Sequence, residues 1–365
     1  MSRRAGKPIG IDARAAAEVP AGRGRYVREL LLALENLPEA ADERFLLYAR
    51  EPWGDLDPAR FRWVTVGLPD PAWHLAAAAR ASRETRAFLS TNSYLTAWFT
   101  LVPTSIVVYD LVPFVDGAQA QARAAKIERA TIRPALRRAA SLPCISQATR
   151  DDLERLFPVS RGKALVTPLA ADPSFGAPVA TPGHPELTRP YVLAVGTLEP
   201  RKNLERLLDA WLALDPAVRE RHDLALVGPR GWDDETIVGK AEAAGARLLG
   251  RVSDDELRAL YAGAAAFAYP SLYEGFGLPV LEAMAAGAPV LTSNVSSLPE
   301  VAGDAALLVD PLDTAAITAG LEQLLTDDAL AARLRADGPV RAAEFSWGRT
   351  ARETLADLRR IARRR

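Results

Sequence analysis

Two glutamates, Glu274 and Glu282, stand eight residues apart on either side of a glycine-rich stretch that leads into a predicted helix. Gly275 and Gly277 have no Cβ atom, so the backbone there can adopt positive φ and approach a ligand closely. Pro279 suits the first turn of a helix, and we expect that helix to run to about residue 286. A helix start favours phosphate and carboxylates accept hydrogen bonds from hydroxyls, so this stretch fits a sugar phosphate.

A second candidate segment, Gly196-Thr-Leu-Glu-Pro-Arg-Lys-Asn203, carries two adjacent cations. Gly196 ends a predicted strand, Arg201 and Lys202 directly precede a predicted helix, and Asn203 stands at its expected N-cap. The cations therefore lie beside a helix start that already favours anions. An Arg-Lys pair in a loop can also be a solvated surface feature. Here, however, the loop follows the first strand of a predicted domain, where ligands of open α/β sheets bind.

The elements that must position these residues alternate between strand and helix. From Tyr191 onward, short aliphatic runs alternate with amphipathic stretches, which predicts parallel βαβ units and a doubly wound sheet. One helix shows helical spacing of its apolar residues, Leu204, Leu207, Leu208, Trp211 and Leu212. The first half repeats the pattern, with strands expected at 8–12, 45–48, 62–66, 105–109 and 142–145 and a helix at 25–36.

Length and prolines divide the chain. At 365 residues the chain exceeds one ordinary core, so two domains are expected. Prolines at 173, 178, 182, 185 and 190 preclude regular structure, which indicates a linker over 172–189. We therefore expect an N-terminal domain at 1–171 and a C-terminal domain at 190–346.

The string PSLYEGFGLPVLEAMAAGAPV, which holds both glutamates, resembles the donor-site signature of the retaining glycosyltransferases of the GT-B fold, family four. The similarity extends through residues 192–211, 224–232 and 293–311, and is strong over 190–345. This resemblance implies an α/β protein of GT-B architecture, with two Rossmann-like, doubly wound parallel-sheet domains facing a cleft. It also implies that the last helix, within 347–365, packs back on the first domain.

The resemblance further implies roles for the second domain. Arg201 and Lys202 would hold the donor diphosphate and stabilise charge on the departing nucleotide. Glu274 would contact the transferred sugar near its reacting face, and Glu282 would bind the ribose hydroxyls. Thr197 stands where many relatives have an arginine, a charge that Arg201 could supply. Further donor contacts are implied for the backbone of Gly275, Phe276, Gly277 and Leu278, and for Arg251 and Val252 near the base.

In the first domain the resemblance is weaker. Gly22 and Gly24 resemble the glycine loop that closes on the diphosphate, although a flexible loop entering a helix would look the same. Tyr109 stands where the family has a histidine that touches the donor sugar. The tyrosine at this position implies one of three things: a 6-deoxy donor sugar, a sugar contact made by the tyrosine hydroxyl in place of the histidine, or low activity. Asp110 could orient the acceptor hydroxyl, or could only form the turn after a strand.

Composition excludes several classes of site. A net charge of −1 and a pI near 6.4 give no general case for nucleic acid binding. Cys144 is the single cysteine, so no internal disulfide forms, and its apolar neighbours indicate a buried thiol. The three histidines lie far apart, and Asp55 and Asp57 are expected in a surface loop, so we expect no metal and no cofactor.

The chain shows no secretory signal, and its most membrane-like run, residues 94–109, is broken by Pro103. We expect that run to be a loop followed by a strand, and the protein to be cytoplasmic. Basic residues near both ends are usually solvated, but they could rest the protein peripherally on an anionic membrane.

The resemblance, together with the absence of a metal-binding pattern in the sequence, implies a metal-independent, retaining hexosyltransferase that uses a nucleotide diphosphate sugar and a saccharide or glycolipid acceptor. GDP-mannose is the first expected donor, by resemblance to mannosyl- and rhamnosyltransferases of surface polysaccharide assembly; dTDP-rhamnose, another 6-deoxy donor or UDP-glucose are alternatives. A GT-B isomerase or phosphorylase, and a noncatalytic nucleotide-sugar binding module, remain open. The transferase hypothesis requires Lys202 and Glu274 to lie together, beside one shared pyrophosphate.

Overall fold

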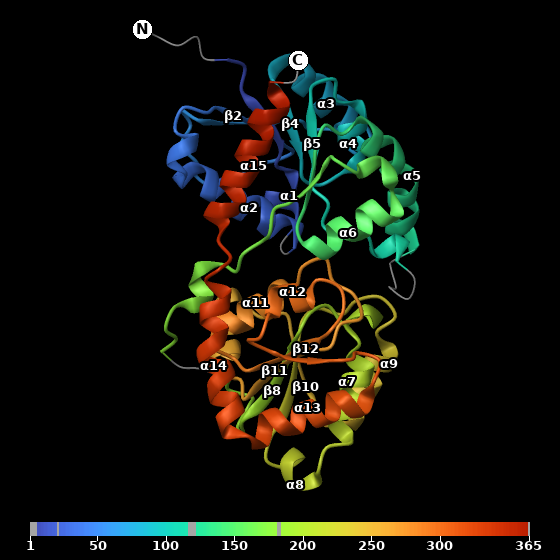
Figure 1. Ribbon diagram of the computed structural model, residues 1–365, viewed down its shortest axis with the longest axis vertical. Helices are drawn as coiled ribbons and strands as arrows, with labels where there is room; N and C mark the ends of the chain where they lie inside the picture. Colours follow the sequence, from blue (N-terminus) through green and yellow to red (C-terminus); the bar gives the residue numbers. More distant parts are fainter. Residues whose placement is uncertain (1–5, 20–21, 116–121, 181–183, 364–365) are drawn as a thin grey trace. The chain divides into compact units, whose positions relative to one another are not determined.

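Strands of three to five residues build two large parallel sheets and one two-stranded sheet in the computed structural model, which describes residues 6–19, 22–115, 122–180 and 184–363 (Figure 1). The described residues form two compact units. Within the described residues, unit 1 draws on 6–114, 122–169 and 346–363, and unit 2 draws on 170–345.

Unit 1 contains a five-stranded parallel sheet in the order β3-β2-β1-β4-β5. All four residues of β1 are buried, as expected for the central strand of a sheet covered on both faces. The strands are β1 (Ile9–Asp12), β2 (Phe45–Ala49), β3 (Phe61–Thr65), β4 (Ala87–Ser90) and β5 (Thr104–Ile106). Three of the predicted strands, those at 8–12, 45–48 and 62–66, are confirmed to within one residue.

The region after β4 differs from the predicted loop and strand. Residues Tyr94–Phe99 form a short helix, α4, because Ser93 Oγ accepts a hydrogen bond from the Leu95 N–H at 3.0 Å and caps it. The strand predicted at 105–109 ends at Ile106, and Val108 only forms an isolated bridge to Cys144. Cys144 closes β6 (Leu142–Cys144), which pairs with β7 (Ala164–Val166), and its thiol is buried as predicted.

The helices of unit 1 surround these strands. The last of them, α15, packs against α2 and against β4 and β5 (Figure 1). Its residues Leu355, Leu358 and Ile361 are buried, and Asp357 accepts hydrogen bonds from Ser105 at 2.9 Å and from Ser141. The helices are α1 (Arg14–Glu18), α2 (Arg23–Asn36), α3 (Ala72–Glu84), α4, α5 (Ala122–Arg138), α6 (Gln147–Leu156) and α15 (Trp347–Ala362).

Unit 2 is built on a six-stranded parallel sheet in the order β10-β9-β8-β11-β12-β13. Its strands are β8 (Tyr191–Val195), β9 (Asp223–Val227), β10 (Arg247–Gly250), β11 (Ala266–Tyr269), β12 (Val290–Ser293) and β13 (Leu307–Val309). Its helices are α7 (Leu204–Leu212), α8 (Pro216–Arg219), α9 (Glu235–Ala243), α10 (Asp254–Gly263), α11 (Leu278–Ala285), α12 (Leu298–Ala302), α13 (Thr314–Thr326) and α14 (Asp328–Ala342). The strand-helix alternation predicted for this half is confirmed.

Two local predictions in unit 2 were wrong. Leu212, expected on the buried face of α7, is 42% exposed, because the face that packs on the sheet ends at Trp211. The proline-rich stretch also contains regular structure, a 3-10 turn at Pro173–Gly176. Pro173 fits its first turn, the Asp172 side chain caps it, and Phe175 is buried edge-on to Tyr261.

Candidate functional site

Three neighbouring strands of unit 2 end at glycines with positive φ, namely Gly196, Gly228 and Gly250. Gly228 donates a hydrogen bond to the Gly250 carbonyl at 2.8 Å, and Gly196 donates to the Val227 carbonyl. A Cβ atom on Gly228 would lie 2.0 Å from the Gly196 carbonyl oxygen, so only glycine fits there. The loops after β8 and β9 therefore lie close together at the carboxyl edge of the sheet, where ligands of open α/β folds bind.

The cationic segment occupies the loop after β8. Arg201 and Lys202 lie in a 3-10 turn, Pro200–Lys202, and Asn203 follows with left-handed backbone angles, φ 59° and ψ 31°. The expected N-cap bond from Asn203 is absent: its side-chain amide instead donates to the carbonyls of Pro270 at 2.9 Å and Pro311 at 2.7 Å. Asn203 thus fastens the cationic turn to the segments after β11 and β13.

The two cations meet Glu274. Lys202 Nζ lies 2.6 Å from Glu274 Oε1, and Arg201 Nη1 lies 2.8 Å from Glu274 Oε2. Tyr269 at the end of β11 donates to Glu274 Oε1 at 2.9 Å, and Arg201 also pairs with Glu199 at 2.5 Å. We call Arg201, Lys202, Tyr269 and Glu274 the ion cluster. The sequence placed Lys202 and Glu274 seventy-two residues apart, and the fold brings them into contact.

The cluster fixes charge states at neutral pH. Burial alone would raise the pKa of Glu274, but the charges of Arg201 and Lys202 outweigh it and lower that pKa to about 2. Burial lowers the pKa of Lys202, although Glu274 opposes this effect. Glu274 is therefore an ionised acceptor of hydrogen bonds and has no proton to donate.

This low pKa predicts an acid-dependent loss of stability. Because the pKa of Glu274 is lower in the folded state, the stabilisation is complete above about pH 4.5 and is lost as the pH falls through about 2. We expect the free energy of unfolding of the wild type to exceed that of Glu274→Gln at pH 7, and the gap to shrink below pH 4.5. Urea unfolding of both proteins at pH 7, 4 and 3 measures it. A gap that stays constant over this range contradicts the assigned ion pairing.

Two serines that the sequence reasoning missed hold the bend around Glu274. Ser296 Oγ accepts a hydrogen bond from the Glu274 N–H at 3.0 Å. Ser297 Oγ donates to the carbonyls of Glu274 at 2.9 Å and Phe276 at 2.7 Å. Both serines lie in the segment 293–311, which carried the family resemblance but had no assigned contact.

The helix after this bend begins at Leu278, one residue earlier than predicted, and Gly277 is its N-cap residue. Gly277 has φ 110°, and a Cβ atom there would lie 2.8 Å from Leu298 Cδ2. α11 runs from Leu278 to Ala285 and has no side-chain cap. Its start can therefore take a hydrogen-bond acceptor from a ligand, beside the half-buried backbone of Gly275.

The other predicted donor contacts range from buried to exposed. Glu282 is 4% exposed on α11 and accepts a hydrogen bond from Tyr261 at 3.3 Å. The Phe276 side chain is buried edge-on to Phe345, so only its backbone remains as a candidate contact. Thr197 is half-buried directly after Gly196. Arg251 is exposed and Val252 half-buried, and both follow β10 at the carboxyl edge.

The two glycines predicted for ligand contact in unit 1 have different environments. Gly22 precedes α2 with φ 55° and open space around its Cα atom. A Cβ atom on Gly24 would lie 1.7 Å from the Val19 carbonyl oxygen, so chain packing alone requires this glycine. Gly22 therefore remains the candidate for ligand contact, whereas the packing against Val19 is enough to explain why residue 24 is a glycine.

Tyr109 does not present its hydroxyl to solvent. The hydroxyl is buried and has no hydrogen-bond partner among the described residues, and the ring lies edge-on to Tyr26 at 5.4 Å. A sugar contact from this hydroxyl would require the side chain to rotate. Asp110 is half-buried, and its Oδ1 accepts from the Val112 N–H at 3.2 Å, which is the turn-forming contact expected of a structural role.

The described residues contain no group of three or more His, Cys, Asp or Glu arranged to hold a metal ion. Asp57 Oδ1 accepts from the Ala59 N–H at 2.9 Å in a turn, as the sequence indicated for a surface loop. In the same part of the chain, no helix combines the length and apolar character needed to cross a bilayer.

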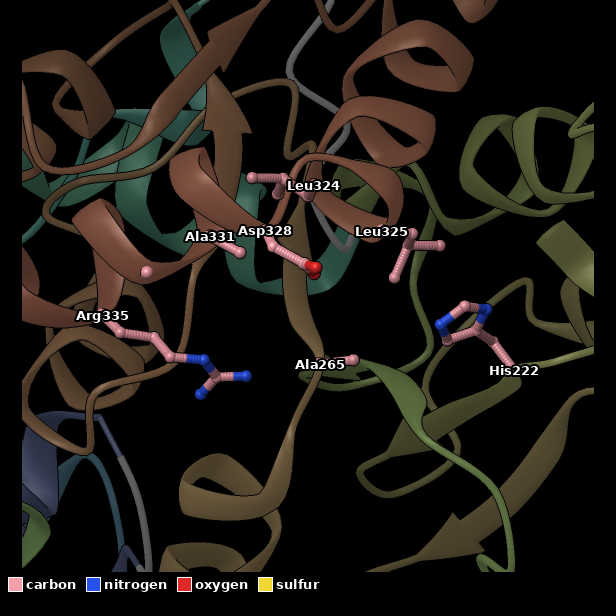
Figure 2. A pocket seen from close by; sticks show the side chains of 8 residues that line it. His222, Ala265, Leu324, Leu325, Asp328, Ala331 and Arg335 are labelled. Atoms are coloured by element: carbon pink, nitrogen blue, oxygen red, sulfur yellow. The ribbon is translucent and has the colours of Figure 1, made fainter.

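A pocket of about 270 Å³ lies elsewhere in unit 2, lined by α13, α14, His222 and Ala265 (Figure 2). His222 and Ala265 directly precede β9 and β11, so the pocket is at the amino edge of the sheet. Arg335 points toward it, but its guanidinium donates to the carbonyls of Gly287 and Ala264. The ion cluster is at the carboxyl edge, so this pocket is separate from the candidate site.

Comparisons with known proteins match this architecture. The family model described as "Glycosyl transferases group 1" matches residues 182–341, the region that holds the ion cluster. The O-antigen chain mannosyltransferase B of Escherichia coli is 41% identical over 221 residues, which cover 58% of this chain and 58% of that protein. The MMP alpha-(1->4)-mannosyltransferase of Mycolicibacterium hassiacum is 35% identical over 220 residues, covering 58% of this chain and 52% of that protein. The chain thus spans little more than half the length of these relatives.

Solved structures resemble the chain over nearly all its length. The sucrose-phosphate synthase of Thermosynechococcus elongatus aligns with a TM-score of 0.75 and 21% identity, covering 98% of this chain and 99% of that one. The HepE protein of Anabaena, solved with UDP and glucose, aligns with a TM-score of 0.74 and 15% identity, covering 97% and 100%. The predicted fold, two Rossmann-like domains of GT-B architecture, is confirmed.

Proposed function

We propose that the chain is a glycosyltransferase that moves a hexose from a nucleotide diphosphate sugar to a hydroxyl of a saccharide or glycolipid. The match of residues 182–341 to the model for group 1 glycosyl transferases supports this proposal. We propose retention of the anomeric configuration and no metal requirement. The acceptor belongs to surface polysaccharide synthesis, on the cytoplasmic face of a membrane with which the protein associates peripherally. The mannosyltransferase names of the relatives support mannose as the sugar, and we propose GDP-mannose as its donor.

The ion cluster is the observation that carries this proposal. Arg201 and Lys202 are only 17% and 12% exposed at their side chains, so their charges act in surroundings of low dielectric. Glu274 balances them in the free protein. A donor diphosphate beside Lys202 would be attracted by the positive charge of Arg201 and Lys202, and would accept further hydrogen bonds from the backbone N–H groups at the start of α11.

The reaction then needs little acid-base chemistry from the protein. The bond between the anomeric carbon and the diphosphate oxygen breaks, and Arg201 and Lys202 stabilise the negative charge that grows on the departing oxygen. The acceptor oxygen attacks from the same face, and the leaving phosphate oxygen takes the acceptor proton. Glu274, ionised at neutral pH, accepts hydrogen bonds from the sugar hydroxyls and does not protonate the leaving group.

A donor screen tests the proposal. The protein is mixed with lipid-linked or free saccharide acceptors and with GDP-mannose, UDP-glucose or dTDP-rhamnose, and released nucleotide and labelled product are measured. We expect mannose transfer with product of retained configuration, and no loss of rate with a chelator. Turnover of a 6-deoxy donor alone would refute mannose. Tight donor binding without turnover on any acceptor would refute transfer and favour a binding module.

A further inference from the structure

Large apolar side chains face solvent on one side of unit 1. Trp98 and Phe99 at the end of α4 are 37% and 39% exposed, and their rings stack at 5.5 Å. Leu101, two residues later, is 73% exposed. The buried residues of α4 are Thr96 and Ala97, so its large apolar side chains are left partly open to solvent.

This apolar region continues onto α5. α4 packs against α5 (Figure 1). Arg138 at the end of α5 donates a hydrogen bond to the Thr100 carbonyl at 3.2 Å. Ile127 precedes Arg138 by eleven residues, which is close to three helical turns, so both lie on the same side of α5. Ile127 is 58% exposed.

A row of positive charge runs beside Ile127. Lys126, Arg133 and Arg137 are exposed and are spaced by seven and four residues, so they share one face of α5. None of the three forms an ion pair within the part of the chain that the structure describes. The single acidic residue in the sequence of α5, Glu128, is half-buried and turned away from this row.

We propose that this region, the α4–α5 surface, rests unit 1 on a bilayer that contains anionic phospholipid. Its apolar part consists of Trp98, Phe99, Leu101 and Ile127, and its cationic part of Lys126, Arg133 and Arg137. The Arg133 guanidinium lies over the Phe157 ring at 5.8 Å but its charge, like those of Lys126 and Arg137, has no carboxylate partner among the described residues. Tryptophan and aliphatic side chains beside such cations match a bilayer interface, where the apolar groups enter the headgroup region and the cations meet lipid phosphates. The inference rests on the proposed function, since a lipid-linked acceptor is presented at such a surface.

Vesicle binding of the full chain tests the α4–α5 surface without any glycosyl transfer. The probes are phosphatidylcholine vesicles with and without phosphatidylglycerol, and the readout is the protein fraction that floats with them. We expect binding to the anionic vesicles that weakens with salt. The variant Leu101→Glu/Ile127→Glu should bind at least about tenfold more weakly, and Lys126→Gln/Arg133→Gln/Arg137→Gln about tenfold or more. All these positions are exposed, so the melting temperature should change little.

Matched variants on other surfaces serve as controls. Val340→Glu changes a residue of unit 2 that is 69% exposed, and Arg44→Gln/Arg62→Gln/Arg247→Gln removes three other exposed cations. Both controls should float like the wild type. Equal losses in the controls, or no binding of the wild type, would overturn the proposal. A wild-type dimer in sedimentation that Leu101→Glu/Ile127→Glu splits would also overturn it, by making this face an interface between copies.

Transfer to a soluble acceptor separates this inference from the proposed function. The α4–α5 variants should retain wild-type turnover on a free saccharide while losing flotation. Flotation without turnover of any donor would leave the docking surface standing and remove the transferase assignment. Turnover without flotation would support the transferase assignment and refute the docking surface.

Discussion

Replacing Lys202 by methionine should lower kcat/KM for sugar transfer about 10³-fold, the largest loss expected for a single side chain here. The substitution removes a buried positive charge at the position proposed for the departing diphosphate. Arg201 remains paired with Glu274, and burial already disfavours the charged lysine, so the folded state should lose little stability. Steady-state kinetics with the active donor, together with thermal melting, measures both effects.

Lys240→Met is the matched control, because Lys240 also belongs to unit 2 and pairs with a carboxylate, Asp209, at 2.7 Å. Its kinetics should equal those of the wild type. If Lys202→Met keeps normal kcat/KM, the proposed role of the ion cluster in transfer is wrong. A loss confined to KM would instead assign Lys202 to donor binding in the ground state.

Glu274→Gln should lower kcat by about 10²- to 10³-fold and should also destabilise the protein. The glutamine keeps the shape but leaves Lys202 as a buried cation without its counter-charge, while Arg201 keeps only Glu199. Breaking a buried ion pair in this way costs about 3 kcal/mol, so the melting temperature should fall by roughly 10 °C. Activity must therefore be compared well below the melting temperature of the variant.

Asp223→Asn controls for that loss of stability. Asp223 is a buried carboxylate at the start of β9, paired with Arg189 at 2.5 Å, at the amino edge of the same sheet. We expect Asp223→Asn to lower the melting temperature while kcat stays near normal. If both variants lose activity in proportion to stability, the effect of Glu274→Gln is structural and gives no support to its role at the sugar.

The sequence allowed the general form of the site to be predicted, because its two parts each have a local signature. A glycine at a strand end and two cations before a helix mark one part, and a glycine bend before Pro279 marks the other. Strand-helix alternation then predicts that both parts reach the carboxyl edge of one sheet. The contact between Lys202 and Glu274 follows from this arrangement.

Contacts between residues far apart in the sequence were not predicted. Asn203 looks like a helix cap in sequence, but its amide reaches Pro270 and Pro311, and no local rule gives that preference. Ser296 and Ser297 were not distinguished from other loop serines because their partners lie more than twenty residues away. The burial of the Tyr109 hydroxyl depends on Tyr26, from a different element.

The place of α15 in unit 1 has a consequence for biosynthesis. The strands of unit 1 leave the ribosome first, yet Trp347, Leu358 and Ile361, which complete its core, are translated only after the whole of unit 2. Until α15 is synthesised, the apolar surfaces of α2, β4 and β5 that it covers stay exposed in nascent unit 1. Unit 2 can complete its folding as soon as residue 345 emerges. Chaperones that recognise exposed apolar chain would meet the amino-terminal part of this protein throughout that interval.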